Sequence, residues 1–302
     1  MPCYSPLKGW VNPESGGIQF KRPSSSAPQK MEVACGQCLG CRLDRSRMWA
    51  SRIVHESMEH DENCFITLTY NNESLPADGS LDKKHYQKFM KRLRKRFPDK
   101  TIRYYMCGEY GEEDNRPHYH ACLFGIEFHD KYPVGYSDAA DEVLYSSPTL
   151  EKLWPFGFVV IGSLDWSSAA YVARYCLKKV TGKEADDHYL RCDEYGVAYW
   201  IEPEYTTMSR RPGIGKSWYE KYKTDVFPSD EVPVPGRGVF KKVPRYYEEQ
   251  YRLEDEIKHE EIKRLRKEFR DSHRDEYTPQ RLMDKYKVQK ASLASLKRGK
   301  AR

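Results

Sequence analysis

The sequence lacks any apolar run close to the roughly 18 residues that a membrane-spanning helix needs. Its first residues also lack the apolar core of a secretory signal peptide. With 39% hydrophobic and 32% charged residues, the composition suits a soluble protein with a modest core. We therefore expect a cytoplasmic protein that has no membrane partner.

A large excess of one charge is also absent: 51 Lys and Arg residues face 45 Asp and Glu residues, which leaves a net charge of +6. Residues 241–302 hold 19 basic and 12 acidic residues, so the rest of the chain sums to −1. A second basic cluster lies at 81–97. Basic patches favour polyanions, most often nucleic acid, so both segments are candidate DNA contacts. For a charge run taken alone, a solvated helix face is the commoner explanation.

A nucleotide-binding loop is missing as well. Residues 213–217 contain GIGKS, but the phosphate-binding pattern GxxxxGK[ST] needs a glycine at the position that Arg210 occupies. We therefore expect no helicase motor in this chain. Residues 213–217 are expected to form a plain loop or a basic, turn-rich DNA contact.

Residue patterning predicts strands and helices through the middle of the chain. Their order (strand, helix, strand, strand, helix, strand, helix) resembles a split βαβ sheet and favours an α+β fold, an antiparallel sheet with flanking helices. The predicted strands are 64–70, 101–110, 117–125 and 156–164, and the predicted helices are 42–60, 82–97, 148–154 and 165–179. We divide the chain into a cysteine-rich N-terminal segment with a helix (1–60), a core (61–185), an extension of the core (186–240) and a charged, partly helical basic tail (241–302).

The predicted strand 117–125 contains His118-Tyr119-His120. Residues two apart in a strand point to the same face, so both imidazoles can bind one divalent metal ion. Most such pairs are packing or surface accidents, and a third ligand is needed. Glu109 ends the preceding strand, and a hairpin would bring it beside the histidines. Two imidazoles and one carboxylate leave positions open for water and a phosphate oxygen, as a catalytic site requires.

A tyrosine pair follows on the predicted helix 165–179, where Tyr171 and Tyr175 lie one turn apart. Spacing alone decides little among 23 tyrosines, but the other pairs four apart enclose Pro or Gly or lie in the charged tail. Arg174 and Lys178 each follow one of the two tyrosines by three residues, which makes them neighbours on a helix. A nearby cation favours the phenolate and can hold a phosphate under attack. The alternative is two tyrosines that pack the helix on the sheet.

Four of the nine cysteines gather near the N-terminus, three of them in CGQCLGC. With the distant Cys3 they fit a four-thiolate structural zinc site, although such ligands usually come as two separated pairs. The adjacent C-x-x-C-x-x-C spacing also suits an iron–sulfur cluster, and free buried thiols are the third interpretation. We do not expect a catalytic role for this group, which comprises Cys3, Cys35, Cys38 and Cys41. The remaining cysteines are expected to be buried thiols, namely Cys64, Cys107, Cys122, Cys176 and Cys192.

Together these motifs resemble the HUH endonuclease superfamily, the rolling-circle replication initiators. FITLTY (65–70) is similar to the family's first motif, and His118-Tyr119-His120 to its second. Tyr175 with Lys178 is similar to the third, and Tyr171 adds the second tyrosine of the two-tyrosine branch. More narrowly, MPCYSPL, CGQCLGCR, GEYG…RPHYH, YVARYCLKK and SRRPGIGKSW resemble the replication initiators of gokushoviruses, the small single-stranded DNA phages of the microvirus group.

The resemblance implies an RRM-like HUH nuclease fold and a metal-dependent, site-specific single-stranded DNA endonuclease with strand-transfer activity. Such an enzyme nicks the viral origin through a tyrosine, stays attached as a 5′-phosphotyrosine, leaves a 3′-OH primer and rejoins the displaced strand into a circle. Expected catalytic residues are Tyr171, Tyr175, Lys178 and Arg174, with Mg²⁺ or Mn²⁺ on Glu109, His118 and His120.

The partners implied are viral origin DNA, either single-stranded or as the supercoiled replicative form, and a host helicase and polymerase in the bacterial cytoplasm. Two other functions fit the residues. One is a zinc-containing DNA-binding protein without catalysis, in which the histidine pair is incidental. The other is a metal-dependent hydrolase that cuts DNA with activated water.

Overall fold

The computed structural model describes residues 3–12, 15, 17–22, 30–111, 114–137, 141–174, 179–180, 182, 184–193 and 195–295. These residues form two compact units. The first unit combines the described parts of 1–45 with those of 261–297, and the second comprises the described parts of 46–260. Helices α1 (Leu39–Ser57) and α8 (Glu256–Ser272) each have residues in both units. No helix in the described ranges is both long and apolar enough to cross a membrane.

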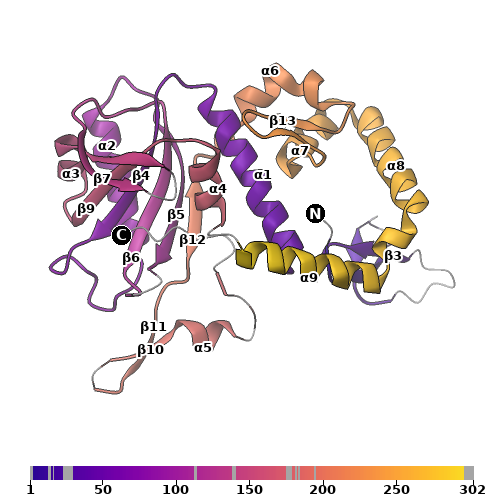
Figure 1. Ribbon diagram of the computed structural model, residues 1–302, viewed down its shortest axis with the longest axis horizontal. Helices are drawn as coiled ribbons and strands as arrows, with labels where there is room; N and C mark the ends of the chain where they lie inside the picture. The colour runs from indigo at the N-terminus through magenta and orange to yellow at the C-terminus, as the bar shows by residue number, and fades with distance from the viewer. Residues whose placement is uncertain are drawn as a thin grey trace. The chain divides into compact units, whose positions relative to one another are not determined.

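The second unit is built on a sheet that has seven strands in the described part of the chain. Every neighbouring pair is antiparallel, in the order β12–β5–β6–β4–β9–β8–β7 (Figure 1). The strands are β4 (Asn63–Tyr70), β5 (Arg103–Tyr110), β6 (Pro117–Phe124), β7 (Tyr132–Ser137), β8 (Glu142–Ser146), β9 (Gly157–Gly162) and β12 (Tyr205–Met208). Strand β6 lies between β4 and β5, which are connected through α2 (Lys83–Arg96). The predicted α+β class and antiparallel sheet are confirmed.

One face of the sheet packs against α2 and α3 (Pro148–Leu153) to form the main core. Alternation in β4 buries Ile66, Leu68 and Tyr70 on this face, as expected for a strand with period two. Helix α2 buries an apolar stripe that includes Phe89, and Asp82 caps it by accepting the Lys84 N–H at 2.7 Å. Full burial of each such apolar side chain contributes about 1.5–3 kcal/mol to folding.

The opposite face of the sheet is covered in part by α4 (Trp166–Arg174), seen beside β5 and β12 in Figure 1. Asp165 caps this helix, because its carboxylate accepts the Ser168 N–H at 2.8 Å. The Ser168 hydroxyl accepts the Asp165 N–H at 2.9 Å in return, which is the reciprocal arrangement of a capping box. Of the predicted helix 165–179, the structure describes α4 to Arg174, and Tyr175 and Lys178 lie outside the described residues.

Strands β7, β8 and β12 extend the sheet beyond the four strands that patterning predicts. The region 186–240 contains further short elements, and the predicted tail contributes helix α7 to the second unit. Tyr247 of α7 is fully buried and donates or accepts a 3.0 Å bond with His55 of α1. These elements are α5 (Ala185–Tyr189), β10 (Leu190–Cys192), β11 (Ala198–Trp200), α6 (Lys216–Val226), β13 (Val232–Val234), β14 (Gly238–Phe240) and α7 (Arg245–Glu254).

The first unit joins the N-terminal residues to the C-terminal helices. Its small antiparallel sheet has the order β2–β1–β3, and a ring contact of 5.6 Å between centroids joins Tyr4 to Tyr286. The elements are β1 (Leu7–Val11), β2 (Ile18–Gln19), β3 (Lys30–Val33), the 3₁₀ turn η2 (Arg274–Tyr277) and α9 (Pro279–Ser295). The segment predicted as a charged tail thus forms helices, and its residues from 261 group with the N-terminus.

Candidate active site

Glu109, His118 and His120, here called the donor group, meet on the face of the sheet that α4 covers. The β5–β6 hairpin pairs Glu109 directly with His118 and Cys107 with His120. One carboxylate oxygen of Glu109 therefore lies 2.8 Å from Nε2 of His118 and 2.9 Å from Nε2 of His120. All three side chains offer ligand atoms within 4.8 Å of one another. The sequence-predicted donors are thus brought together.

The other ring nitrogen of each histidine has its own partner. Nδ1 of His118 lies 3.0 Å from the carbonyl oxygen of Arg116, and Nδ1 of His120 lies 2.9 Å from the hydroxyl of Thr67. Such partners orient the ring and select the tautomer that points Nε2 inward. The contact between Thr67 and His120 was not predicted from the sequence. The alternation of strand β4 was the available signal, because it places Thr67 on the same face as Phe65, which also contacts His120.

The carbonyl partner of His118 bears on whether the donor group can accept a cation. A carbonyl only accepts, so Nδ1 of His118 carries the proton and a neutral ring leaves a lone pair on Nε2. That lone pair faces the Glu109 carboxylate oxygen at 2.8 Å. Two lone pairs repel at this distance unless a proton or a metal ion lies between them. The residues present therefore fit a bound divalent cation.

Electrostatics keep the Glu109 carboxylate charged. Burial by itself would raise its pKa, but the hydrogen bonds of the two histidines, and their charge when the rings are protonated, outweigh burial and lower the pKa to about 2. Only 1% of Glu109 and 5% of His120 is exposed. A buried carboxylate that is ionised near neutral pH, placed between two imidazoles, suits a hard or borderline divalent metal.

Arg116, just before β6, joins this strand to the end of β4. Its guanidinium donates to the carbonyl of Tyr70 at 3.0 Å and to the side-chain oxygen of Asn72 at 2.7 Å. Tyr119, between the two histidines, points to the opposite face, where its hydroxyl donates to the Asp82 carbonyl at 2.9 Å. This contact explains why a tyrosine stands between the two histidines: its side chain anchors strand β6 on the core face of the sheet.

Tyr171 of α4 stands over the donor group. Its ring centroid lies 5.1 Å from that of His120 at an interplanar angle of 86°, and 6.2 Å from that of Phe65. Phe65 in turn stacks on His120 at 5.7 Å. Tyr171 is 39% exposed, whereas Glu109 and His120 beneath it are buried. Arg174, one turn further on, is also exposed.

The basic helix α2 and the GIGKS loop, both considered above as DNA contacts, lie away from the donor group. Helix α2 packs on the core face of the sheet, behind the donor group, so its lysines do not line this site. In the GIGKS loop, the Gly215 N–H donates to the buried Glu56 carboxylate at 2.6 Å, and the Ile214 carbonyl accepts from Arg52 at 3.0 Å. The Gly215 N–H is therefore satisfied within the protein and is not free to hold a phosphate, while a DNA contact by the basic side chains of this loop stays a prediction.

A second candidate metal group lies in the first unit. The sulfur atoms of four cysteines, Cys3, Cys35, Cys38 and Cys41, lie within 4.8 Å of one another. Of the other cysteines, Cys64, Cys107 and Cys122 are buried as expected. Cys192 is exposed, which corrects the expectation of a buried thiol, because it ends the short edge strand β10. Cys176 lies outside the described residues.

Comparison with known proteins gives consistent matches. The family described as Replication-associated protein ORF2/G2P matches residues 63–180. Replication-associated protein VP4 of Bdellovibrio phage phiMH2K is 32% identical over 259 residues, which cover 83% of this chain and 78% of that protein. Replication-associated protein ORF2 of Spiroplasma virus 4 is 31% identical over 268 residues, covering 82% and 79%. Replication-associated protein ORF4 of Chlamydia phage 1 is 36% identical over 162 residues, covering 51% and 40%. No solved structure matches the chain.

Proposed function

Because the chain belongs to the family of gokushovirus-type phage replication-associated proteins, we propose that it initiates rolling-circle replication as an HUH endonuclease. The strand order β5–β6–β4–β9, with β6 between two strands joined by a helix, supports a split βαβ core of that superfamily. The substrate is single-stranded DNA at the viral origin, exposed in the replicative form.

The observation that carries the proposal is the position of Tyr171 over the donor group. A partly exposed phenol beside His120, whose Nε2 converges with that of His118 on Glu109, can meet a phosphate bound at those three residues. Phosphoryl transfer requires a nucleophile and a group that binds and polarises the phosphate, both placed on the same side of the substrate. Tyr175 lies four residues after Tyr171 in the sequence and is the second candidate nucleophile.

Glu109, His118 and His120 would hold Mg²⁺ or Mn²⁺, which draws charge from the scissile phosphate when bound. The tyrosine oxygen attacks phosphorus, a bond from phosphorus to the phenol oxygen forms, and the bond to the 3′ oxygen breaks. The phenol proton passes to solvent, and the 3′ oxygen takes up a proton to become a 3′-OH. Arg174 and Lys178 are assigned to holding the phosphate oxygens.

Rejoining is the reverse step. A 3′-OH attacks the 5′-phosphotyrosine, so one phosphodiester replaces one phosphotyrosine and no ATP is consumed. A second tyrosine lets the enzyme cut the regenerated origin while the first still carries the displaced strand. The 3′-OH would prime a host polymerase in the bacterial cytoplasm, and a host helicase would separate the strands, since Arg210 replaces the glycine of a nucleotide-binding loop.

The test uses labelled single-stranded oligonucleotides that together tile the genome encoding this chain. Each is incubated with the full-length protein and Mn²⁺, then resolved on a denaturing gel. We expect one oligonucleotide to give a covalent protein–DNA band and a shorter free product. The band should disappear in the Tyr171→Phe, Tyr175→Phe double variant.

Tyr222→Phe is the matched control, because Tyr222 is also on a helix and is 37% exposed, against 39% for Tyr171. It should form the adduct normally. Cleavage without an adduct would mean that activated water, not tyrosine, is the nucleophile. Binding without cleavage, at every oligonucleotide and metal concentration, would leave a DNA-binding protein and refute the enzyme.

A further inference from the structure

We propose that the four-cysteine cluster (Cys3, Cys35, Cys38 and Cys41) binds a single zinc ion through four thiolates, and that this ion holds the first unit in its folded state. The proposal is independent of the nicking reaction, because the cluster belongs wholly to the first unit and the donor group to the second.

The spacing of the sulfur atoms fits one shared ion. Sγ of Cys3 lies 3.6 Å from that of Cys35 and 3.8 Å from that of Cys38. A tetrahedral zinc with Zn–S bonds of about 2.3 Å has S···S edges of about 3.8 Å. A disulfide would need about 2.05 Å between its sulfurs. An iron–sulfur cluster interposes several atoms between its thiolates, so it needs them farther apart than one ion does.

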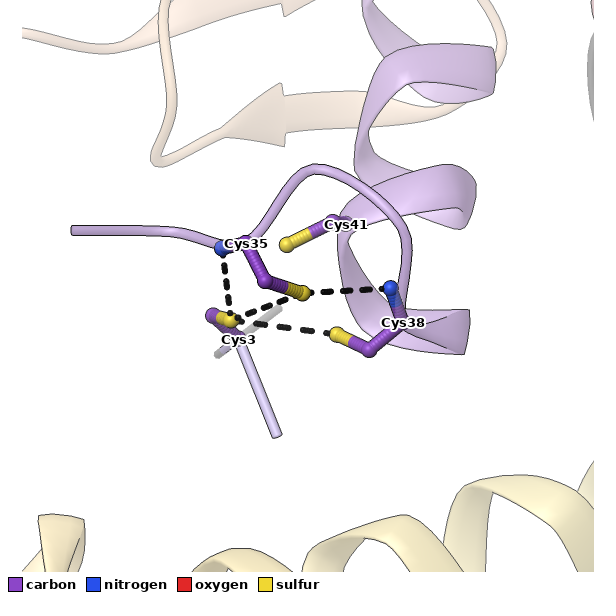
Figure 2. Close-up of side chains that lie close together, drawn as sticks. All are labelled: Cys3, Cys35, Cys38 and Cys41. Atoms are coloured by element: carbon purple, nitrogen blue, oxygen red, sulfur yellow. Dashed lines mark hydrogen bonds between the residues drawn. The ribbon is translucent and has the colours of Figure 1, made fainter. Parts of the chain in front are cut away.

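Backbone amides point at the sulfur atoms. The N–H of Cys35 donates to Sγ of Cys3 at 3.2 Å, and the N–H of Cys38 donates to Sγ of Cys35 at 3.2 Å (Figure 2). The N–H of Tyr4 donates to Sγ of Cys38 at 3.3 Å. Donors aimed at sulfur stabilise the thiolate over the thiol. Four thiolates around a dication leave a net negative charge, and these amides offset part of it.

The N-terminal end of helix α1 also stabilises the thiolates. Cys38 lies just before the helix and Cys41 lies in its first turn, as Figure 2 shows, and that turn contains no acidic residue. The N-terminal end of a helix carries a partial positive charge, which favours a thiolate close to it. The loop from Cys35 to Cys38 turns at Gly36, whose φ of +75° suits glycine.

The first unit has little else to hold it together. Within its described residues, the buried apolar side chains are Ile262 and Leu282. Its sheet consists of strands of five, two and four residues. A small unit without a substantial core commonly depends on a metal or a disulfide. Because Cys3 is adjacent to Tyr4, which contacts Tyr286, an ion on Cys3 also holds the N-terminal segment that contacts α9.

Elemental analysis of the full chain tests the proposal. We expect one zinc per chain and no iron or inorganic sulfide. Cys38→Ser should lose the zinc. Cys192→Ser is the matched control, since it removes an exposed thiol outside the cluster, and should keep it. A His118→Ala, His120→Ala double variant should also keep it, which separates this ion from any metal at the donor group.

Two further measurements guard against a variant that does not fold. Replacement of zinc by Co²⁺ in the wild-type chain should give the charge-transfer absorption of a tetrahedral cobalt thiolate. Hydrogen exchange after removal of zinc by a chelator should show lost protection in β1 and β3, while β4 and β6 stay protected.

Several outcomes would overturn the proposal. A folded wild-type chain without bound metal would do so, as would iron with sulfide, or zinc that persists in Cys38→Ser. Unchanged protection of β1 and β3 after metal removal would refute the folding role.

Discussion

Replacing Thr67 by Val tests whether the orientation of His120 supports metal binding. The Thr67 hydroxyl lies 2.9 Å from Nδ1 of His120, and the two residues are paired across β4 and β6. Valine keeps the shape and the strand preference of threonine but removes the hydroxyl. The imidazole then loses the partner that selects its tautomer, while its Nε2 contact with Glu109 is retained.

The structure sets the size of the effect. Loss of a partner that orients a metal-binding histidine typically weakens metal affinity by about 10–100-fold. Here the ring is still stacked on Phe65 at 5.7 Å and contacted edge-on by Tyr171 at 5.1 Å, so it cannot rotate freely. We therefore expect the low end, about tenfold weaker Mn²⁺ binding, or about 1.4 kcal/mol.

The assay is a titration of the full-length chain with Mn²⁺, followed by electron paramagnetic resonance of the free ion. In the nicking assay, Thr67→Val should be slow at low Mn²⁺ and recover when Mn²⁺ is saturating. Such recovery would separate a loss of affinity from a loss of the reactive geometry.

Thr69→Val is the matched control. Thr69 lies on the same strand face, is similarly half-buried and pairs with His118, whose Nδ1 already has the Arg116 carbonyl as its partner. It should bind Mn²⁺ as the wild type does. Unchanged affinity in Thr67→Val, or an equal loss in both variants, would refute the reasoning.

Three further predictions follow from the described contacts. His120→Ala should abolish nicking at any Mn²⁺ concentration but leave much of the DNA binding intact, and normal nicking by this variant would disprove the metal assignment. Burial lowers the pKa of His55 to about 4, so folding favours the neutral ring. Stability from this group is complete above the unfolded pKa of about 6.5 and is lost as pH falls towards 4, by at most about 3 kcal/mol. Urea unfolding between these pH values should show the loss, and His55→Gln should lack it. Replacing Lys88 and Lys91 of α2 by Glu should leave single-turnover nicking at saturating DNA unchanged, because α2 lies on the other face of the sheet; a slower chemical step would contradict that geometry.

The local elements of the core could be predicted because their information is local. The alternation in FITLTY and in the strand of His118 and His120 has the period of a strand, and the apolar spacing around Phe89 has the period of a helix. The predicted boundaries agree with β4, β6 and α2 to within a few residues. A short turn between two strands leaves few registers, so the pairing of Glu109 with His118 could be anticipated from the hairpin.

Contacts between distant segments could not be read in this way. Strand β12 pairs with β5 after nearly a hundred intervening residues. Nothing in the four residues of β12 indicates that β5 is its partner. The burial of Tyr247 against His55 joins a charged helix to the second unit. Both depend on which surfaces the rest of the chain leaves open.

The sequence by itself determined which groups are present: two imidazoles on one strand face, a carboxylate one hairpin away, Tyr171 on a following helix and a cluster of thiols. Only the tertiary structure decided that Tyr171 stands over His120, that Thr67 supports the ring from a neighbouring strand, and that Cys3 joins the other three thiols. The physical reason is that residue type and periodicity are properties of short segments. The closeness of two side chains far apart in the chain is instead set by how whole elements pack.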